Sequence, residues 1–290
     1  MGISRRQFLA GATGALAGAR LVLPRLAVAQ AAPKIRIGAC DWSLRAVNPE
    51  GLEVAKKIGL EGLEVSAGGP EDTLKIAGSK LRDEYKTLMS KTGIAVPSVA
   101  MGLLNNAPLA SDPRGVAWLN QTIEAAKDLG ASVILIAFFG KGDLLAGKEL
   151  KQKDVDTVVG RLQEVASKAK EAGVILGLEN TLSAEQNLAI LDRVKSDMVR
   201  VYYDIGNSTD GGYDVPAEMR LLGDRICQIH FKDGNAYLGQ GKVKMEPVAE
   251  AINAINYKGW IVLETAIPSK DRDADFKKNA DFVRKLLKLA

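Results

Sequence analysis

The chain has 290 residues, 47% of them hydrophobic and 26% charged, which is typical of a soluble globular protein with one large domain or two small ones. Its formal net charge of +4 comes from the first 29 residues, which contain four arginines and no acidic residue; without them, 35 basic side chains stand against 35 acidic ones. This balance gives no support for nucleic-acid binding, which would require a basic patch.

Residues 1–29 predict an export signal. A twin arginine, Arg5-Arg6, lies in "SRRQFL" and precedes a mildly apolar stretch that ends in "AVA", a sequence typical of a signal-peptidase site. Two further arginines interrupt the apolar run, which is shorter than the roughly 20 residues of a membrane span. We therefore expect export by the twin-arginine machinery, cleavage, and a periplasmic protein of residues 30–290 without stable membrane insertion. An uncleaved tether is the alternative.

From residue 34 on, apolar runs of strand-like composition alternate with amphipathic stretches of helical period. The predicted strands are 34–42, 60–66, 94–101, 132–139, 174–180, 199–205, 226–232 and 260–265. The predicted helices are 49–58, 79–92, 115–129, 152–172, 184–195, 216–223, 245–256 and 273–288. Several helices end at a glycine just before the next strand, as is usual in αβ units.

Eight such β–α units in about 255 residues predict the α/β class and a (β/α)8 TIM barrel forming a single domain over 30–290. The alternative is a doubly wound open sheet, which usually carries a glycine-rich phosphate loop after its first strand. Here that strand leads into "GACDWSLRAVNPEG", which contains no GxGxxG. Cys40 and Cys227 fall on strands that would not be neighbours, so we expect buried free thiols rather than a disulfide.

In a TIM barrel the active site lies at the carboxyl ends of the strands. Four consecutive predicted strands place Glu179, Asp204, His230 and Glu264 at or near those ends. One such acid could be a helix N-cap, and one histidine could be a packed core residue. Neighbouring parallel strands lie only about 5 Å apart, however, so the four side chains should converge.

Three carboxylates brought together would repel one another unless a cation lay between them. Three carboxylates and one imidazole form a hard, oxygen-rich ligand set. This set favours one divalent ion in an open site, Mn²⁺ in the first place with Mg²⁺ or Co²⁺ as alternatives, and is less typical of zinc.

The motifs that carry these residues are "LGLEN" with Glu179, "YYDIGN" with Asp204, "QIHFKD" with His230 and "IVLET" with Glu264. In this order they resemble the xylose isomerase-like barrel superfamily, in its sugar phosphate isomerase/epimerase branch, which includes the ketose 3-epimerases. The resemblance covers the chain from about residue 34 to its end. It implies that the four residues bind one divalent metal and that Glu179 and Glu264 are also the catalytic acid/base pair.

The chemistry of such a pair also follows from general principles. Removing a proton next to a carbonyl builds negative charge on the carbonyl oxygen, which a bound cation stabilises. Two carboxylates on opposite faces of the substrate can take a proton from one face and return one to the other. This inverts a stereocentre, and the same groups could run aldose–ketose isomerisation or β-elimination.

The substrate contacts depart from the resemblance. Several epimerases have a histidine where this chain has Asn207, and an arginine beyond the metal-binding histidine where it has "GNAYLG". Lys232 shares the His230 side of its strand, so it either reaches the substrate or pairs with a carboxylate. Trp42 and Glu64 end earlier strands, where they line the pocket or belong to the core.

Asp233 is expected to be a loop or cap residue rather than part of the site. The single histidine excludes the related multi-zinc endonucleases, and it also excludes xylose isomerase proper, which needs an additional catalytic histidine.

The leading hypothesis is a periplasmic, divalent-metal-dependent sugar isomerase or epimerase acting on a free sugar or keto-sugar. One alternative is a lyase or hydratase acting on 3-keto-glycosides, which shares the proton abstraction. Another is a sugar-binding barrel without activity, which the missing histidine and arginine favour. A homo-oligomer is left open, because related barrels often dimerise.

Overall fold

The computed structural model describes residues 34–289, and the predicted export signal, with Arg5 and Arg6, lies outside them. Eight parallel strands close into a barrel in the order β1-β10-β9-β8-β7-β4-β3-β2, which rules out the open sheet. The barrel strands are β1 (Arg36–Cys40), β2 (Gly62–Ser66), β3 (Ser98–Met101), β4 (Val133–Ala137), β7 (Ile175–Glu179), β8 (Val199–Asp204), β9 (Ile226–Phe231) and β10 (Trp260–Leu263). Each lies within a predicted strand, so the TIM barrel is confirmed.

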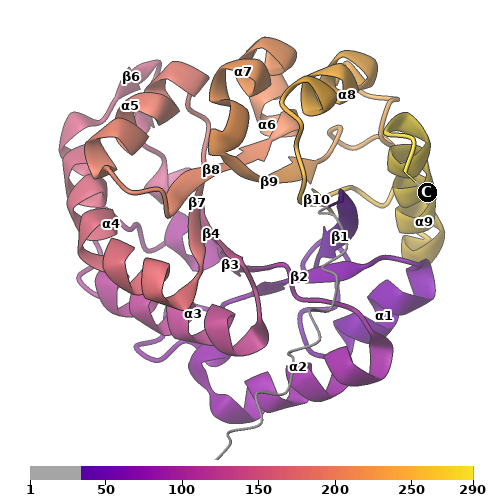
Figure 1. Cartoon of the computed structure of the whole chain (residues 1–290), viewed down its shortest axis with the longest axis horizontal. Coiled ribbons are helices and arrows are strands. Elements are labelled where there is room, and N and C mark those ends of the chain that lie inside the picture. Colours follow the sequence, from indigo (N-terminus) through magenta and orange to yellow (C-terminus); the bar gives the residue numbers. More distant parts are fainter. Residues whose placement is uncertain (1–33, 290) are drawn as a thin grey trace, which may run out of the picture. The chain divides into compact units, whose positions relative to one another are not determined.

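Helices surround the barrel (Figure 1). They are α1 (Gly51–Ile58), α2 (Ser79–Thr92), α3 (Gly115–Leu129), α4 (Gln152–Ala172), α5 (Ala184–Val194), α6 (Ile205–Asp210), α7 (Val215–Leu222), α8 (Met245–Ala254) and α9 (Arg272–Leu286). All but α6 match a predicted helix to within about two residues at each end, the usual uncertainty of helix boundaries. Short 3-10 turns at Lys75–Ala77, Gly102–Asn105, Gly140–Gly142 and Gly223–Arg225 complete the connections.

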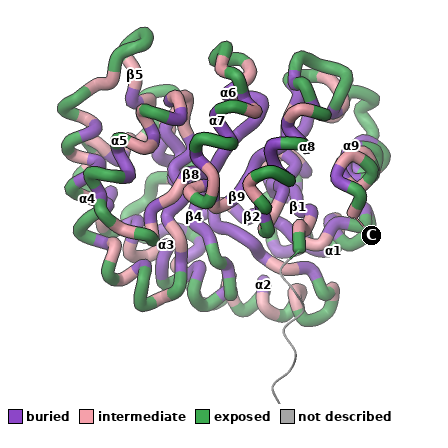
Figure 2. The backbone as a smooth tube through the Cα atoms, turned by 45° about the horizontal axis from the view of Figure 1, so that its top comes forward, coloured by how far each residue is buried: buried purple, intermediate pink, exposed green. Residues whose placement is uncertain are grey.

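The helix ends explain why the boundaries were predictable. The helix α4 ends at Gly173, which adopts a left-handed φ of 70° and whose N–H reaches the carbonyls of Ala169 and Lys170. This geometry favours glycine and caps carbonyls that the helix leaves unpaired. The chain then enters β7 directly, and the burial pattern follows: barrel strands are largely buried and the outer faces of the helices are exposed (Figure 2).

Strand register brings the predicted site together. Asp204 pairs with His230 between β8 and β9, and Val262 pairs with His230 between β9 and β10. On the other side of the barrel, Cys40 pairs with Glu64 between β1 and β2. All these residues therefore lie near the carboxyl ends of their strands.

Two elements differ from the sequence prediction. A small antiparallel pair, β5 (Leu145–Ala146) and β6 (Glu149–Leu150), follows β4, and the helix α6 directly follows β8. The side chain of Asp204 accepts a hydrogen bond from the N–H of Asn207 at 2.7 Å and so caps α6. A helix of this length is set by its cap and surroundings rather than by a periodic apolar face.

Both cysteines are free, as expected, and β10 separates their strands. Cys40 is fully buried, but Cys227 is only partly buried, so the expectation of two buried thiols holds for the first alone. Over residues 34–289, no helix is both long and apolar enough to cross a lipid bilayer.

Candidate metal and proton-transfer site

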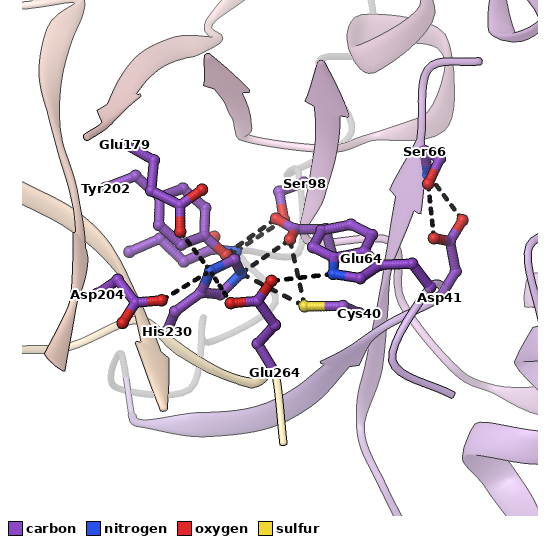
Figure 3. Close-up of polar contacts among 12 residues, drawn as sticks. Cys40, Asp41, Glu64, Ser66, Ser98, Glu179, Tyr202, Asp204, His230 and Glu264 are labelled. Carbon is purple, nitrogen blue, oxygen red and sulfur yellow. Dashed lines mark hydrogen bonds and ion pairs between the residues drawn. The ribbon is translucent and has the colours of Figure 1, made fainter. Parts of the chain in front are cut away.

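Glu179, Asp204, His230 and Glu264 form one cluster at the carboxyl ends of β7 to β10, here called the carboxylate–histidine cluster. One ligand atom from each lies within 4.8 Å of all the others. The Nδ1 of His230 is 2.8 Å from Glu179 Oε1 and 3.7 Å from both Asp204 Oδ2 and Glu264 Oε2. Figure 3 shows the three carboxyl groups directed toward the imidazole. The predicted convergence is therefore confirmed.

The cluster fits a divalent cation. Asp204 caps α6 with Oδ1, while its buried Oδ2 faces the cluster, where the Lys232 ammonium lies 3.0 Å away and no neutral donor reaches it. A buried carboxylate oxygen of this kind favours a cation beside it. Three carboxylates and one imidazole nitrogen are hard donors suited to Mn²⁺, Mg²⁺ or Co²⁺. Glu179, Asp204, His230 and Glu264 are thus the residues that would hold such an ion.

The environments of the carboxylates differ. Burial raises the pKa of Glu179 to about 7 against the opposing charge of His230, and it also raises the pKa of Asp204. For Glu264, burial is outweighed by the positive charges of His230 and Lys232, and the pKa falls to about 2. Neighbouring carboxyl groups whose pKa values differ in this way are typical of acid/base sites.

The imidazole of His230 lies between two acidic groups. Burial opposes its positive charge, but Cys40, Glu179 and Glu64 outweigh burial and raise the pKa of His230 well above its usual value. Burial also raises the pKa of the Cys40 thiol, which is therefore neutral. The two carboxylates are consequently the groups that favour the imidazolium.

Lys232 pairs with carboxylates, one of the two alternatives that the sequence left open, and contact with the substrate stays a prediction. Its Nζ lies 2.7 Å from Glu264 Oε2 and 3.0 Å from Asp204 Oδ2, and its side chain also lines the cavity above the cluster. Burial opposes the charge of the ammonium, but Asp204 and Glu264 outweigh it and raise the pKa of Lys232. The ammonium therefore neutralises part of the cluster from one side.

Replacing Lys232 by Met is expected to raise the affinity for Mn²⁺ about tenfold or more, about 1.4 kcal/mol, because it removes a cation that competes for Asp204 and Glu264. Calorimetric titration of the metal-free protein measures the change. Lys242→Met is the matched control, since Lys242 is exposed and pairs only with Asp210. An unchanged or weaker affinity of Lys232→Met for Mn²⁺ would contradict the competition.

A cavity of about 500 Å³ opens above the cluster. Its polar wall includes Glu179, Glu264, Lys232 and Asn207, and Trp42 donates a hydrogen bond from Nε1 to Glu264 Oε1 at 3.0 Å. The remaining lining residues are mostly small or apolar: Ser66, Gly68, Ala100, Gly102, Leu103, Asn105, Leu135, Ala137 and Phe139. Both proposed catalytic carboxylates thus face one space in which a small molecule fits.

The sequence left two alternatives for Glu64, a pocket-lining or a core residue, and the structure bears out the core position. Its side chain is fully buried and does not reach the cavity. It lies behind His230, with Oε1 at 2.9 Å from Nε2, and its other contacts are Cys40, Ser98 and Tyr202. Glu64 lies in the middle of β2, two residues before Ser66, which does line the cavity, so the imidazole separates Glu64 from any substrate.

The sequence reasoning missed the polar layer around Glu64. Tyr202 and Gln228 precede Asp204 and His230 by two residues, so they share the inward face of their strands. That period-two spacing was the available signal, but such positions normally hold apolar core residues. Asp233 is confirmed as a loop residue, since its carboxylate accepts hydrogen bonds from the backbone N–H groups of Gly239, Gly241 and Val243.

Asp41, next to Trp42, is a buried acid held by the N–H and hydroxyl of Ser66. Burial outweighs these hydrogen bonds and raises its pKa to about 6, against roughly 3.9 in an unfolded chain. Because the folded-state pKa is the higher one, ionised Asp41 destabilises the fold above pH 6, and the penalty disappears below about pH 4.

Asp41→Asn is therefore expected to raise the free energy of unfolding by up to about 3 kcal/mol above pH 7, a shift of about two pKa units. The gain should fall toward zero near pH 4. Urea titrations of wild type and variant between pH 4 and pH 8 measure it. A difference independent of pH would contradict the raised pKa.

The sequence matches the family described as the xylose isomerase-like TIM barrel over residues 52–286. The chain belongs to this family. This xylose isomerase-like barrel is 26% identical over 260 residues to an L-ribulose-5-phosphate 3-epimerase of Escherichia coli (strain SMS-3-5), which covers 81% of this chain and 88% of the relative.

Solved structures agree on the fold of this xylose isomerase-like barrel. An L-ribulose 3-epimerase superposes with a TM-score of 0.72 at 24% identity, over 88% of this chain and 95% of that one. A 3-keto-D-glucoside 4-epimerase from E. coli has a TM-score of 0.72 at 16% identity, over 87% and 100% of the two chains. The relatives are thus sugar epimerases, which are isomerases.

Proposed function

We propose that the protein is a divalent-metal-dependent epimerase or isomerase of an unphosphorylated keto-sugar. The observation that carries this proposal is the pair Glu179 and Glu264, which face one cavity and share the carboxylate–histidine cluster. A sugar-binding barrel without activity would not need two acidic groups with such different environments at one site. The epimerase relatives support the same reaction class.

The chain's own residues suit a proton transfer. Glu264 is the ionised carboxylate, held by hydrogen bonds from Trp42 and Lys232, and is placed to remove a proton from a substrate carbon. Glu179, the buried acid, is placed to deliver a proton. A bound divalent cation would supply positive charge beside the carbonyl oxygen on which negative charge builds. Exchanging the two roles runs the reaction backwards.

The cavity lining supports a substrate without phosphate. Lys232 is its only cationic side chain within residues 34–289, and that ammonium already contacts Asp204 and Glu264. Phosphate recognition normally uses free Arg or Lys side chains or exposed backbone N–H groups. With two carboxylates in the same lining, a phosphate dianion would be repelled rather than held. Here the proposal departs from the substrate named for the curated E. coli relative.

A second candidate is a lyase or hydratase acting on 3-keto-glycosides. The apolar wall formed by Leu103, Leu135 and Phe139 favours it, because a glycoside would place its second group against such a surface. The fold likeness to a 3-keto-D-glucoside 4-epimerase is consistent with a cavity of this kind. Both candidates begin with removal of a proton next to a carbonyl.

Deuterium exchange tests the proposal. Mn²⁺-loaded protein is incubated in D₂O with free ketoses, keto-glycosides and ribulose 5-phosphate, and products are followed by NMR. We expect deuterium on the carbon beside the carbonyl, with inversion for an epimerase and loss of a substituent for a lyase. Exchange with the phosphate ester alone would contradict the substrate class, and no exchange with any compound would favour a binding protein.

Two further proposals do not rest on the structure. Export by the twin-arginine route to the periplasm rests on Arg5 and Arg6, and it agrees with a free sugar because phosphosugars are mainly cytoplasmic metabolites. A homo-oligomer rests on the frequent dimerisation of related barrels.

A further inference from the structure

Glu64 is the acceptor at the centre of a buried hydrogen-bond network behind the carboxylate–histidine cluster (Figure 3). Its Oε2 accepts hydrogen bonds from Ser98 Oγ at 2.5 Å and Tyr202 OH at 2.9 Å. Its Oε1 lies 2.9 Å from His230 Nε2. Glu64, Ser98, Tyr202 and His230 are all nearly or completely inaccessible to solvent. No water competes for these bonds, so each proton must have a definite place.

Gln228 sets the direction of the network. Its Nε2 lies 2.7 Å from Ser98 Oγ and 2.8 Å from Tyr202 OH, so one amide hydrogen points at each hydroxyl. An NH₂ group can only donate, so both hydroxyl oxygens accept from Gln228 and turn their own protons toward Glu64. Oε2 of Glu64 then carries no proton. With Glu64 as a carboxylate its Oε1 can only accept, so the bond to His230 requires a hydrogen on Nε2.

The opposite orientation of the Gln228 amide would cost more. In the orientation described, Gln228 Oε1 is a buried acceptor without a partner. Turning the amide over would give that oxygen a partner but leave both N–H donors without an acceptor. The two hydroxyls would then no longer both donate to Glu64. Each buried polar group without a partner costs about 1–3 kcal/mol, so one unpaired acceptor is better tolerated than two unpaired donors.

We propose that Glu64, oriented through Ser98 and Tyr202 by Gln228, is the positioning residue that keeps a hydrogen on His230 Nε2 and presents Nδ1 to the metal. The inference rests on the proposed metal site, because it says which nitrogen of His230 is the ligand. A metal-binding histidine commonly donates its second N–H to a carboxylate, which fixes the ring orientation and makes the ligand nitrogen more basic.

The single histidine permits a direct test, because a protein labelled with ¹⁵N-histidine gives signals from His230 alone. Long-range ¹H–¹⁵N spectra of the whole protein are recorded without metal and with the diamagnetic ion Mg²⁺. We expect a slowly exchanging hydrogen on Nε2 in both states, and a shift of the Nδ1 signal when Mg²⁺ is added. A hydrogen on Nδ1 in the Mg²⁺-loaded protein, with Nε2 as ligand, would overturn the proposal.

Glu64→Gln keeps the shape of the side chain but places an NH₂ group in a network that needs an acceptor on both sides. We expect Mn²⁺ affinity to fall about 10- to 100-fold and the Nε2 hydrogen to exchange faster with water. Asp41→Asn is the matched control: Asp41 is equally buried at the next position after β1, but it is held by Ser66 and makes no contact with His230. It should leave both readings unchanged.

The double variant Glu64→Gln/Gln228→Glu separates orientation from packing. The new carboxylate at position 228 would accept hydrogen bonds from the hydroxyls of Ser98 and Tyr202. The oxygens of these hydroxyls would accept from the NH₂ group of the new amide at position 64, and the oxygen of that amide would accept from His230. The network is thus restored with its acid and amide exchanged. We expect the double variant to bind Mn²⁺ at least fivefold more tightly than Glu64→Gln alone, a coupling that a double-mutant cycle reports.

Two results would overturn the proposal: unchanged Mn²⁺ affinity and Nε2 exchange in Glu64→Gln, or a double variant that binds no better than Glu64→Gln. Its failure is distinguishable from failure of the proposed function. If the wild type bound no divalent ion, the metal site would be wrong, while the slow exchange of the Nε2 hydrogen in metal-free protein would still report the contact between Glu64 and His230.

Discussion

Glu264→Gln is expected to lower kcat for epimerisation about 10²- to 10⁴-fold, the usual contribution of a positioned acid or base. The amide keeps the size of the side chain and can still accept from Trp42 and contact Lys232, but it cannot take a proton from carbon. The sharper expectation concerns isotope exchange. If Glu264 serves one face of the substrate, the variant loses deuterium exchange with one epimer and keeps it with the other, whereas Glu179→Gln shows the reverse preference.

The control for these variants is Glu218→Gln, a buried acid of α7 that accepts from the N–H of Ala184 and contacts Tyr203, away from the cavity. It should leave kcat unchanged within about twofold. Because Glu179 and Glu264 are also proposed ligands, bound Mn²⁺ is measured in each variant and activity is compared at saturating metal. Equal exchange of both epimers by Glu264→Gln would remove its assignment as a base.

The barrel was predictable because its signals are local. A glycine can end a helix in the left-handed conformation wherever it stands, and an apolar strand ends where the first charged residue must leave the core. Asp204 and Glu264 follow such runs directly, so their strand ends could be placed from the sequence. The barrel topology then brings those ends together, and the convergence of the four residues needed no further information.

The features that were missed depend on contacts between distant residues. The sequence left Glu64 as a pocket or a core residue, and the structure places it in the middle of β2, where the imidazole of His230 covers it. Only the register of the closed barrel shows which residues of a strand reach the cavity and which lie one layer below it. The helix α6 is likewise held by the cap from Asp204 rather than by its own sequence.

Lys232 shows a further limit of strand alternation. The spacing placed it correctly on the His230 side, but pairing with a carboxylate and reaching the substrate were left as alternatives. The aliphatic stem is long enough for the side chain to line the cavity while its ammonium lies between Asp204 and Glu264. The alternation within one strand does not predict which side chain of a neighbouring strand will be the partner.

Saturating Mn²⁺ is expected to raise the Tm of the wild type. Three carboxylates that repel one another in the folded protein should bind the cation far better than the unfolded chain does, so binding stabilises the native state. At a free concentration about 100-fold above Kd the gain is about 2.7 kcal/mol, which corresponds to roughly 5–10 °C for a domain of this size. Differential scanning calorimetry with and without chelator measures the shift.

Asp204→Asn is the decisive variant for this metal effect. An asparagine can still cap α6 through its side-chain oxygen, but it places an NH₂ group where Oδ2 faces the cluster. Without metal the variant should be at least as stable as the wild type, because burial opposes the ionised carboxyl group and raises the pKa of Asp204. With Mn²⁺ the gain in Tm should fall below about 2 °C, because the ion loses one ligand and meets a donor instead. A full Mn²⁺-dependent rise in Tm in this variant would show that the ion binds elsewhere, since the new NH₂ group offers no lone pair to a cation.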